Sequence, residues 1–411
     1  MLCRREKGGV IPMDMPLALS NIRVLDLTRV MAGPYCTMYL ADLGAEVIKI
    51  EIPGSGDDTR KLPPFQNGES LYYCNLNRNK KGVTLNLKSH AGKELFKEMV
   101  KNADVVVENY RPGVMDKLGV GYDVLKEVNP RIIYAAVSGF GSYGPLHQRP
   151  GYDIIAQAMS GLMSLTGEYG GGPLRTGSAI GDLVGGLNLC IGILAAINGR
   201  QITGKGQRVD VSLVDGLVSC LENNTQRYQV NGVQPVRMGN RYPSAAPYDS
   251  FKASDGDFVI GCGNDKLFSL LCTKVLNRPE LVNDPRYATP ADRLAHEAEL
   301  KVIVEEWSTQ HTIEEAVDMV LAAGVPAGPI NDIKAVMEND HIANVREMFL
   351  DCDHPVAGHL RINGNPVKLM DSMPRLRTAP PALGQDNEDV YENVFGVSPE
   401  RLQELKEQGV I

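Results

Sequence analysis

The sequence has little of what marks several large classes of protein. Its 411 residues include one tryptophan and seven histidines, and they contain no block of lysine and arginine. Acidic residues outnumber basic ones by 50 to 42, so the formal net charge is −8. This balance argues against a nucleic-acid partner, because such proteins carry a basic surface. No apolar run reaches about 18 residues without a glycine or polar break, so the sequence predicts neither a transmembrane helix nor a membrane partner.

The eight cysteines lack the spacing of a zinc site or of a disulfide framework. None forms a CxxC pair and no His/Cys cluster accompanies them, so we expect no metal. Several lie in apolar runs, where a cysteine acts as a small hydrophobic residue. Scattered free cysteines, and a start without the apolar core of a signal peptide, favour a cytoplasmic protein. Residues 1–15 read as a tail or an over-long start, with Met13 or Met15 as alternative initiators.

The first part of the chain alternates between strands and helices. Residues 21–28 have the composition of a buried strand, Gly33 and Gly44 bound a helix, and 47–50 form a second strand. This βαβ unit predicts neighbouring parallel strands. Further strands are predicted at 83–89, 104–108 and 131–141, helices at 90–103 and 122–128, and a loop-rich stretch at 52–82. The fold class is therefore α/β, with a large doubly wound sheet.

A nicotinamide-binding domain would begin in the same way, but its glycine-rich fingerprint is missing. The turn after the first strand reads TRVMAGP rather than GxGxxG, and Glu51 after the second strand is only a weak echo of the ribose-binding acid. Ligands of open α/β sheets bind at the carboxyl ends of the strands. The polar residues expected there are Arg29, Asn109, Arg111 and Ser138.

A single carboxylate, Asp182, precedes a long apolar run and has glycines on both sides. The run LVGGLNLCIGILAAING is too long for a strand and predicts a buried helix. A carboxylate at the mouth of such a helix must be solvated, paired, capping or catalytic, because an isolated buried charge is very unfavourable. Its spacing alone favours a helix cap.

A second, smaller α+β domain is expected over about 225–330. It contains a hairpin at Asp255-Gly256 and helices at 265–276, 299–310 and 312–324. After it, residues 354–370 alternate like sheet, the proline-rich stretch 374–387 reads as a surface linker, and the last 20 residues look helical.

Several motifs, in order, resemble the class III CoA-transferases. They are RVLDLTRVMAGPYCTMYLADLGAEVIKIE, ENYRPG, SGFG followed by GP, RPGYDIIAQAMSG, the Asp182 segment and GKGQRVDVSL. The resemblance implies a large Rossmann-like CoA-binding domain formed by both chain ends, with residues 16–224 as its first part, 225–330 as the small domain, and 331–411 as linker and return. It also implies an interlocked homodimer that takes acyl-CoA and a small carboxylic acid as substrates, with no tightly bound cofactor.

Asp182 matches the catalytic aspartate of this family, which would pass through an aspartyl-CoA thioester. Covalent catalysis of this kind divides a difficult exchange into easier steps. The resemblance also implies a set of CoA-binding positions, namely Met31, Ala32, Leu85, Asn86, Leu87, Lys88, Asn109, Tyr110, Arg111, Lys117, Arg149, Pro150, Gly151 and Tyr152. Surface charge would equally explain Lys88 and Lys117, and packing would explain Tyr110. The glycines around Asp182 would allow close backbone approach.

The chain departs from the family's formyl-CoA:oxalate enzymes at three places. Met31 stands where they tend to have glutamine, Ile52 stands where they have arginine, and RMGNRYPSAAPY lacks their tetraglycine loop. We therefore keep formyl-CoA:oxalate transfer as an alternative and expect a succinyl-CoA-like or acetyl-CoA-like donor with a dicarboxylate acceptor. Gly239, Asn240 and Arg241 are the expected substrate-binding residues. Arg237 or Arg241 would pair with the distal carboxylate.

An α-methylacyl-CoA racemase is the other alternative. Racemases of this superfamily have histidine where this chain has Tyr152, and they need two opposed acid/base groups. Tyrosine is a poor base at neutral pH. The nearby His147 reads as a surface residue. A CoA-binding relative without chemistry would lack the nucleophile, which is present here.

Overall fold

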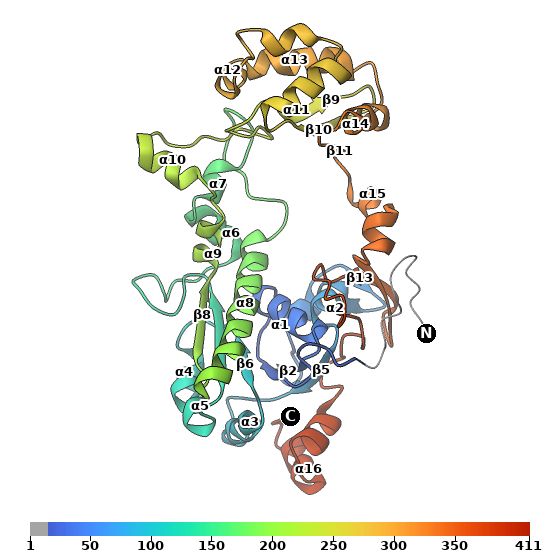
Figure 1. The fold of residues 1–411 in the computed structure, drawn as a ribbon. Coiled ribbons are helices and arrows are strands. Elements are labelled where there is room, and N and C mark those ends of the chain that lie inside the picture. The colour runs from blue at the N-terminus through green and yellow to red at the C-terminus, as the bar shows by residue number, and fades with distance from the viewer. Residues whose placement is uncertain (1–14) are drawn as a thin grey trace. The chain divides into compact units, whose positions relative to one another are not determined.

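The computed structural model describes residues 15–411, so the prediction about the first 14 residues lies outside the described part. The chain forms two compact units. The first unit holds a six-stranded sheet with the order β5-β2-β1-β6-β7-β8 (Figure 1). Its strands are β1 Arg23–Asp26, β2 Glu46–Glu51, β5 Lys80–Thr84, β6 Val105–Glu108, β7 Ile133–Ser138 and β8 Arg208–Ser212. All neighbours pair in parallel, and the order reverses between β1 and β6. The expected doubly wound α/β architecture is confirmed.

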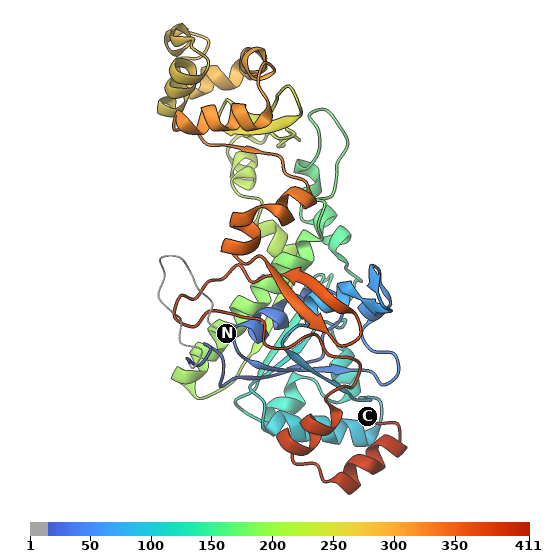
Figure 2. The ribbon, with the colours of Figure 1, turned by 90° about the vertical axis from the view of Figure 1, so that its right-hand side faces the viewer.

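Helices cover both faces of this sheet because alternate strand residues point to opposite sides. Val24 belongs to the core on one face, with α1 Ala32–Asp42, α6 Asp153–Met159, α8 Ile180–Thr203 and α9 Leu213–Ser219. Its neighbour Leu25 belongs to the core on the other face, with α3 His90–Lys101, α4 Val114–Leu118, α5 Tyr122–Val128 and α16 Pro399–Glu407. Figure 2 shows α16 beside α3, although the two are far apart in sequence.

The predicted buried helix is α8, but only one of its faces is buried. Leu189 and Ile193 pack into the core with α1, whereas Ile191 is 63% exposed and Ile202 is 83% exposed. By length and composition alone α8 is long and apolar enough to cross a membrane, which the sequence analysis did not anticipate. Core helices pass the same test, and the buried face of α8 packs as a core helix does.

The loop-rich stretch predicted at 52–82 contains regular structure. It holds η1 Asp58–Lys61, the short hairpin β3 Phe65–Gln66 and β4 Glu69–Ser70, and α2 Leu71–Asn77. The strand predicted at 83–89 also lies earlier, at Lys80–Thr84. The prediction failed because Lys80 reads as a surface residue, although its ammonium is buried and contacts Asp26 at 3.0 Å. Thr37 and Asn77 accept further hydrogen bonds from it.

The second unit comprises Met163–Arg175 and Asn223–Asn339. The predicted hairpin is confirmed as β9 Tyr248–Lys252 and β10 Asp257–Gly261, and β11 Ala327–Pro329 joins it antiparallel. Its helices are α10 Asn224–Asn231, α11 Asp265–Leu270, η2 Leu271–Val275, η3 Pro279–Asn283, α12 Pro290–Ala295, α13 Glu297–Ser308, α14 Ile313–Ala322 and α15 Ile333–Glu338, with α7 Leu162–Leu165 at the boundary. The sequence had given 163–175 to the large domain. Arg237 holds this segment in the second unit by donating to Gly171 O at 2.8 Å.

The C-terminal part returns to the first unit through η4 His341–Val345 and the hairpin β12 Phe349–His354 and β13 Gly358–Asn363. The stretch 374–387, expected as a surface linker, instead lies along β5. Asp386 Oδ2 accepts from Gly82 N at 2.7 Å, and Asn387 Oδ1 accepts from Thr84 N at 2.8 Å. These contacts cover what would be an open sheet edge. The helical turn η5 Asp389–Val394 and α16 follow.

Candidate active site

A cavity of about 150 Å³ lies in the first unit where the strand order reverses. It contains the four polar residues expected at the strand ends, namely Arg29, Asn109, Arg111 and Ser138. Ten of the predicted site residues line it, namely Met31, Ala32, Asn109, Tyr110, Arg111, Arg149, Pro150, Gly151, Tyr152 and Asp182. The fold therefore brings most of the predicted site together.

Two of the turns that form the cavity are tied to each other. Arg29 N donates to Asn109 Oδ1 at 2.9 Å, and Asn109 Nδ2 donates back to Arg29 O at 2.7 Å. The Arg29 guanidinium lies 5.7 Å from the ring of Tyr110 and 3.1 Å from Asp58 Oδ2. The turn after β1 and the turn after β6 thus form one wall with a positively charged rim.

A buried ion pair, which the sequence analysis did not predict, makes hydrogen bonds to the turn after β1. Val30 has φ of 67°, a left-handed conformation that a β-branched residue rarely adopts. Asp57 Oδ1 accepts from Val30 N at 3.1 Å, and Asp57 Oδ2 lies 2.7 Å from the Lys49 ammonium. Lys49 also donates to Thr28 O. Backbone strain of this kind clusters at functional sites, and here it directs Met31 and Ala32 to the cavity.

Two further contacts shape the turns after β6 and β7. Glu108 accepts from Tyr110 N at 2.7 Å and from the Tyr134 hydroxyl at 3.1 Å, and burial raises its pKa to about 7. Gly139 and Gly151 pack backbone to backbone, since a Cβ on Gly139 would lie 2.6 Å from Gly151 Cα. Any larger residue at either glycine would push the predicted CoA-binding segment 149–152 away from β7.

Asp182 lies in the first turn of α8, but it does not cap the helix. The N-cap residue is Ala179, and the side chain of Asp182 accepts no hydrogen bond from any residue in 15–411. The capping role that its spacing favoured is therefore wrong. A half-buried carboxylate without partners is unusual, because burial of a charged group is normally compensated by hydrogen bonds or an opposite charge.

The ionisation of Asp182 is shifted accordingly. Burial raises the pKa of its carboxyl group to about 7, and the nearby charge of Asp153 adds to the rise. The position in the first helical turn acts in the opposite sense, since a helix N-terminus stabilises negative charge. Near neutral pH this carboxyl group is therefore only partly ionised.

Asp153 makes the contacts that Asp182 lacks. Its Oδ1 accepts from Gly181 N at 2.7 Å, and its Oδ2 accepts from Gln157 Nε2 at 2.7 Å. Gln157 Oε1 in turn accepts from Thr176 N at 3.0 Å. This buried network fixes the start of α8 and thereby the position of Asp182. The only signal for this network in the sequence is the acid in the motif GYD.

The glycines near Asp182 allow close approach between helices. A Cβ on Gly186 would lie 2.6 Å from Ala32 O of α1, and one on Gly185 would lie 2.4 Å from the side chain of Leu213. These glycines let α8 approach α1 and α9 closely. This packing holds Asp182 and Ala32 in the same cavity.

Some predicted CoA-binding residues do not line this cavity. They are Leu85, Asn86, Leu87, Lys88 and Lys117. Leu85 is 2% exposed and packs in the core, and Asn86 N donates to Val410 O at 2.7 Å. Lys88 and Lys117 are exposed.

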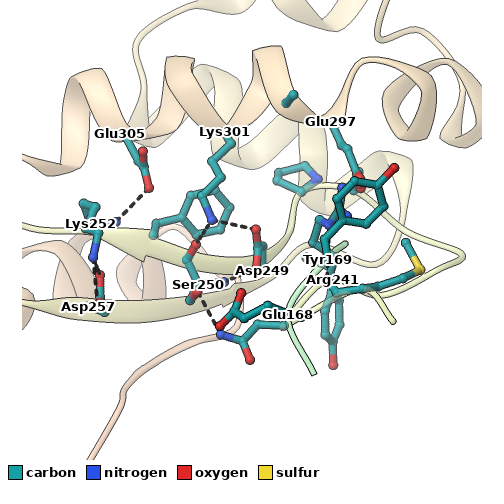
Figure 3. Close-up of a pocket in the computed structure, with 18 residues that line it drawn as sticks. Glu168, Tyr169, Arg241, Asp249, Ser250, Lys252, Asp257, Glu297, Lys301 and Glu305 are labelled. Carbon is teal, nitrogen blue, oxygen red and sulfur yellow. Dashed lines mark hydrogen bonds and ion pairs between the residues drawn. The ribbon is translucent and has the colours of Figure 1, made fainter. Parts of the chain in front are cut away.

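The predicted acceptor residues Gly239, Asn240 and Arg241 line a different pocket, of about 480 Å³, in the second unit (Figure 3). Arg241 is already engaged there, because it pairs with Glu297 and stacks at 4.3 Å on Tyr169. Arg237 donates to backbone oxygens of Gly171 and Ser164. Arg237 is thus engaged with the backbone, whereas Nη2 of Arg241 is buried without a hydrogen-bond partner.

A larger cavity in the first unit, of about 610 Å³, shares Met31 with the cavity of Asp182. Tyr72 of α2 lines it, and burial together with the charge of Asp182 raises the pKa of Tyr72 to about 12. Tyr72 therefore lies near the carboxylate. Sequence reasoning missed it because the segment was taken as loop. Within 15–411 no group of three or more His, Cys, Asp or Glu is arranged to hold a metal ion.

Comparison with known proteins agrees with this geometry. The family model described as CoA-transferase family III matches residues 19–387. The chain belongs to CoA-transferase family III. Its relatives include an acetyl-CoA:oxalate CoA-transferase of Acetobacter aceti, 44% identical over 85% of this chain and 88% of the relative. The mouse succinyl-CoA:glutarate CoA-transferase is 39% identical over 97% of this chain and 91% of the relative.

A solved structure agrees as well. The crystal structure of a CAIB/BAIF family protein from Brucella suis is 37% identical, with a TM-score of 0.82 over 92% of this chain and 100% of that chain. This family III protein is therefore a CoA-transferase, and CoA thioesters are its substrates. The resemblance inferred from the motifs is confirmed.

Proposed function

We propose that this family III enzyme moves CoA from an acyl-CoA donor to a dicarboxylic acid through an aspartyl-CoA thioester on Asp182. The observation that carries the proposal is the state of Asp182. It is a half-buried carboxylate without hydrogen-bond partners, it lies in a cavity at the switch point of the sheet, and its pKa is about 7. A nucleophile must be available rather than occupied, and no other described carboxylate of this cavity combines these properties.

The chemistry needs four steps. An Asp182 oxygen attacks the thioester carbonyl of the donor, the C–S bond breaks, and a mixed anhydride and the CoA thiolate form. The thiolate attacks the aspartyl carbonyl, which releases the donor acid and leaves aspartyl-CoA. The acceptor carboxylate attacks that thioester and expels the thiolate again. The thiolate then attacks the acyl carbonyl of the new anhydride, which gives the product acyl-CoA and regenerates Asp182.

The residues around Asp182 would bind CoA and stabilise charge. Each anhydride-forming step creates an oxyanion, which backbone N–H groups can stabilise. Ala32 and Gly33, at the start of α1, have N–H groups without an intrahelical acceptor, and Ala32 lines the cavity. Arg29, Arg111 and Arg149 surround the opening and suit the phosphates of CoA. Lys88 and Lys117 remain proposed contacts for more distant parts of CoA.

The acceptor is proposed to be a dicarboxylate because the relatives named above act on oxalate and on glutarate. The donor is proposed to be a succinyl- or acetyl-CoA-like thioester on the same ground. Oxalate stays among the candidate acceptors, since the relative named for it is 44% identical although this chain has Met31 and Ile52. A racemase would need a second acid/base group opposite Asp182, and Tyr152 offers none at neutral pH.

We also propose an interlocked homodimer in the cytoplasm. Exposed apolar side chains of the first unit support the dimer, namely Ile154, Ile155, Met159, Leu187, Ile191 and Val218. All seven cysteines within 15–411 are free, which is consistent with a reducing compartment. Light scattering in solution tests the dimer, and a monomer would contradict it.

Trapping of the intermediate tests the mechanism. The enzyme is incubated with succinyl-CoA or acetyl-CoA, treated with hydroxylamine or borohydride, and digested for mass spectrometry. We expect the modification on Asp182, and none in Asp182→Ala. If Asp182 stays unmodified with every donor, the covalent mechanism is wrong. Exchange of deuterium at the α-carbon of a 2-methylacyl-CoA would then indicate a racemase.

A further inference from the structure

The cavity of about 610 Å³ next to Asp182 has a distinct chemical character. Its walls come from α2, from the start of α8 and from β13, and Met31 separates it from the smaller cavity that Asp182 lines. Ser178, Ala179 and Leu183, which line it, flank Asp182 in sequence. A group that reacts with Asp182 can therefore extend into this cavity.

The lining contains basic residues but no acidic residue. Arg361 and His359 contribute the basic side chains, and most of the remaining lining residues are apolar or uncharged amides and hydroxyls. The pocket of the second unit has the opposite balance of charge, because five acidic and three basic residues line it. The first cavity therefore offers an anion basic groups without an acidic residue in its lining, although Asp351 and Asp353 beside it pair with these basic residues.

Arg361 is available to bind such an anion. Its Nε lies 3.6 Å from Asp351 Oδ1, which is too long for a hydrogen bond, and its guanidinium lies 5.6 Å from the ring of Phe349. No residue within 15–411 accepts a hydrogen bond from this guanidinium. The guanidinium is therefore ion-paired with Asp351 through Nε, but its N–H groups make no hydrogen bond and its two Nη atoms face no carboxylate among these residues. Arg237, by contrast, donates to two backbone oxygens, and Arg241 pairs with Glu297 and keeps only Nη2 without a partner.

The position of Arg361 follows from the alternation of β13. Leu360 and Ile362 point into a small core with Cys352 and Ala357, so His359 and Arg361 lie on the opposite, exposed face. Asn363 N donates a hydrogen bond to Asn75 Oδ1 of α2 at 2.9 Å, which ties β13 to the helix that carries Tyr72 (Figure 1). His359 is less suited to the role, because Asp353 Oδ1 lies 3.0 Å from its Nδ1.

We propose that Arg361 binds the distal carboxylate of the acceptor acid, whose carbon chain lies in this cavity against Leu71, Leu76 and Leu183. The inference rests on the proposed function, and it specifies the substrate class. The preferred acceptors are linear dicarboxylates with several apolar carbons between the two carboxylates, because the lining between Asp182 and Arg361 is largely apolar. Arg361 is in this view a specificity residue and not a catalytic one.

Matched acceptors and variants test this proposal. Glutarate and pentanoate have five carbons each, and only glutarate has a second carboxylate. We expect Arg361→Gln to lower kcat/KM for glutarate by about 100-fold, chiefly through KM, and for pentanoate by less than about 3-fold. Arg361→Lys should retain part of the preference. Arg401→Gln, an exposed arginine of α16, is the control and should change neither value.

A charge reversal sharpens the test. Arg361→Glu should make 5-aminopentanoate a better acceptor than glutarate, a gain that a merely unfolded variant cannot produce. Equal losses for glutarate and pentanoate in Arg361→Gln, or no loss, would overturn the assignment of Arg361. A wild type that prefers pentanoate would also overturn it. Trapping of Asp182 by the donor in each variant separates these outcomes from failure of the covalent mechanism, in which wild-type Asp182 itself stays unlabelled.

Discussion

Two carboxylates near the start of α8, Asp153 of α6 and Asp182 of α8 itself, differ in what surrounds them. Asp153 is buried, and both of its oxygens accept hydrogen bonds, from Gly181 N and from Gln157. Asp182 is less buried but accepts no hydrogen bond from residues 15–411. The pair teaches that burial alone does not identify a reactive group. The satisfied carboxylate holds the helix in place, and the unsatisfied one is left free for chemistry.

The largest effect is expected when the unsatisfied carboxylate is replaced. Asp182→Asn keeps the shape of the side chain but removes the nucleophile, so turnover should fall by about 10⁴-fold or more without loss of thermal stability. Asp215→Asn is a matched control, since Asp215 holds the same place in the first turn of α9. Steady-state transfer assays and thermal melts check both variants. If Asp182→Asn retained a tenth of the wild-type activity, Asp182 would not be the nucleophile.

Replacing the satisfied carboxylate should act first on the fold. Asp153→Ala leaves Gly181 N and Gln157 Nε2 without acceptors, so the free energy of unfolding should drop by about 1–3 kcal/mol. Turnover should fall by about 10- to 100-fold because the start of α8 is no longer fixed. Chemical denaturation and transfer assays measure the two losses. An Asp153→Ala variant with unchanged stability would show that the network does not hold the helix.

The two carboxylates are also expected to differ in their effect on pH dependence. The attacking form of Asp182 is ionised, so labelling by acyl-CoA should rise with pH through a midpoint of about 7. Asp153→Asn removes the neighbouring charge that raises this pKa, so the midpoint should move to lower pH. Rapid-quench labelling between about pH 5 and 9 measures it. If the labelling midpoint of Asp153→Asn moves to higher pH, electrostatic repulsion between Asp153 and Asp182 does not raise the pKa of Asp182.

The smallest effect concerns stability. The folded pKa of Asp182 lies above its ordinary value of 3.8, so between these two values the folded state binds more protons than the unfolded state. This contribution to stability is therefore present at low pH and is lost as pH rises through the folded pKa. Asp182→Asn should be more stable than the wild type at pH 8 and equal to it near pH 4. Thermal melts at the two pH values test the sign.

The regular parts of the fold could be predicted because their signals are local. The helix at Tyr122–Val128 and the hairpin around Asp255-Gly256 agree with the structure, and the motifs identified the family. α2 and the start of β5 could not be predicted. Lys80 has the polar side chain of a surface residue, yet it is buried and forms an ion pair with Asp26. Local composition does not report a partner that is distant in the chain.

The same limit applies to the site. Asp182 and the turns after β1 and β6 could be proposed from motifs, because each is a short contiguous pattern. Tyr72, Asp57 and Arg361 could not, since nothing in their neighbours shows that the fold brings them to Asp182 or beneath its cavity. The partners of the arginines proposed from sequence, which are backbone oxygens for Arg237 and Glu297 for Arg241, likewise appear only in three dimensions.

The packing of α16 on α3 has a consequence for how the protein is made. Leu402, Leu405 and Val410 complete the core that also holds Leu95 and Phe96. On the ribosome, this face of the sheet emerges early and stays uncovered until almost the whole chain has been synthesised. Its apolar residues then need protection from aggregation, such as a chaperone provides, and folding of the first unit finishes only after translation of α16.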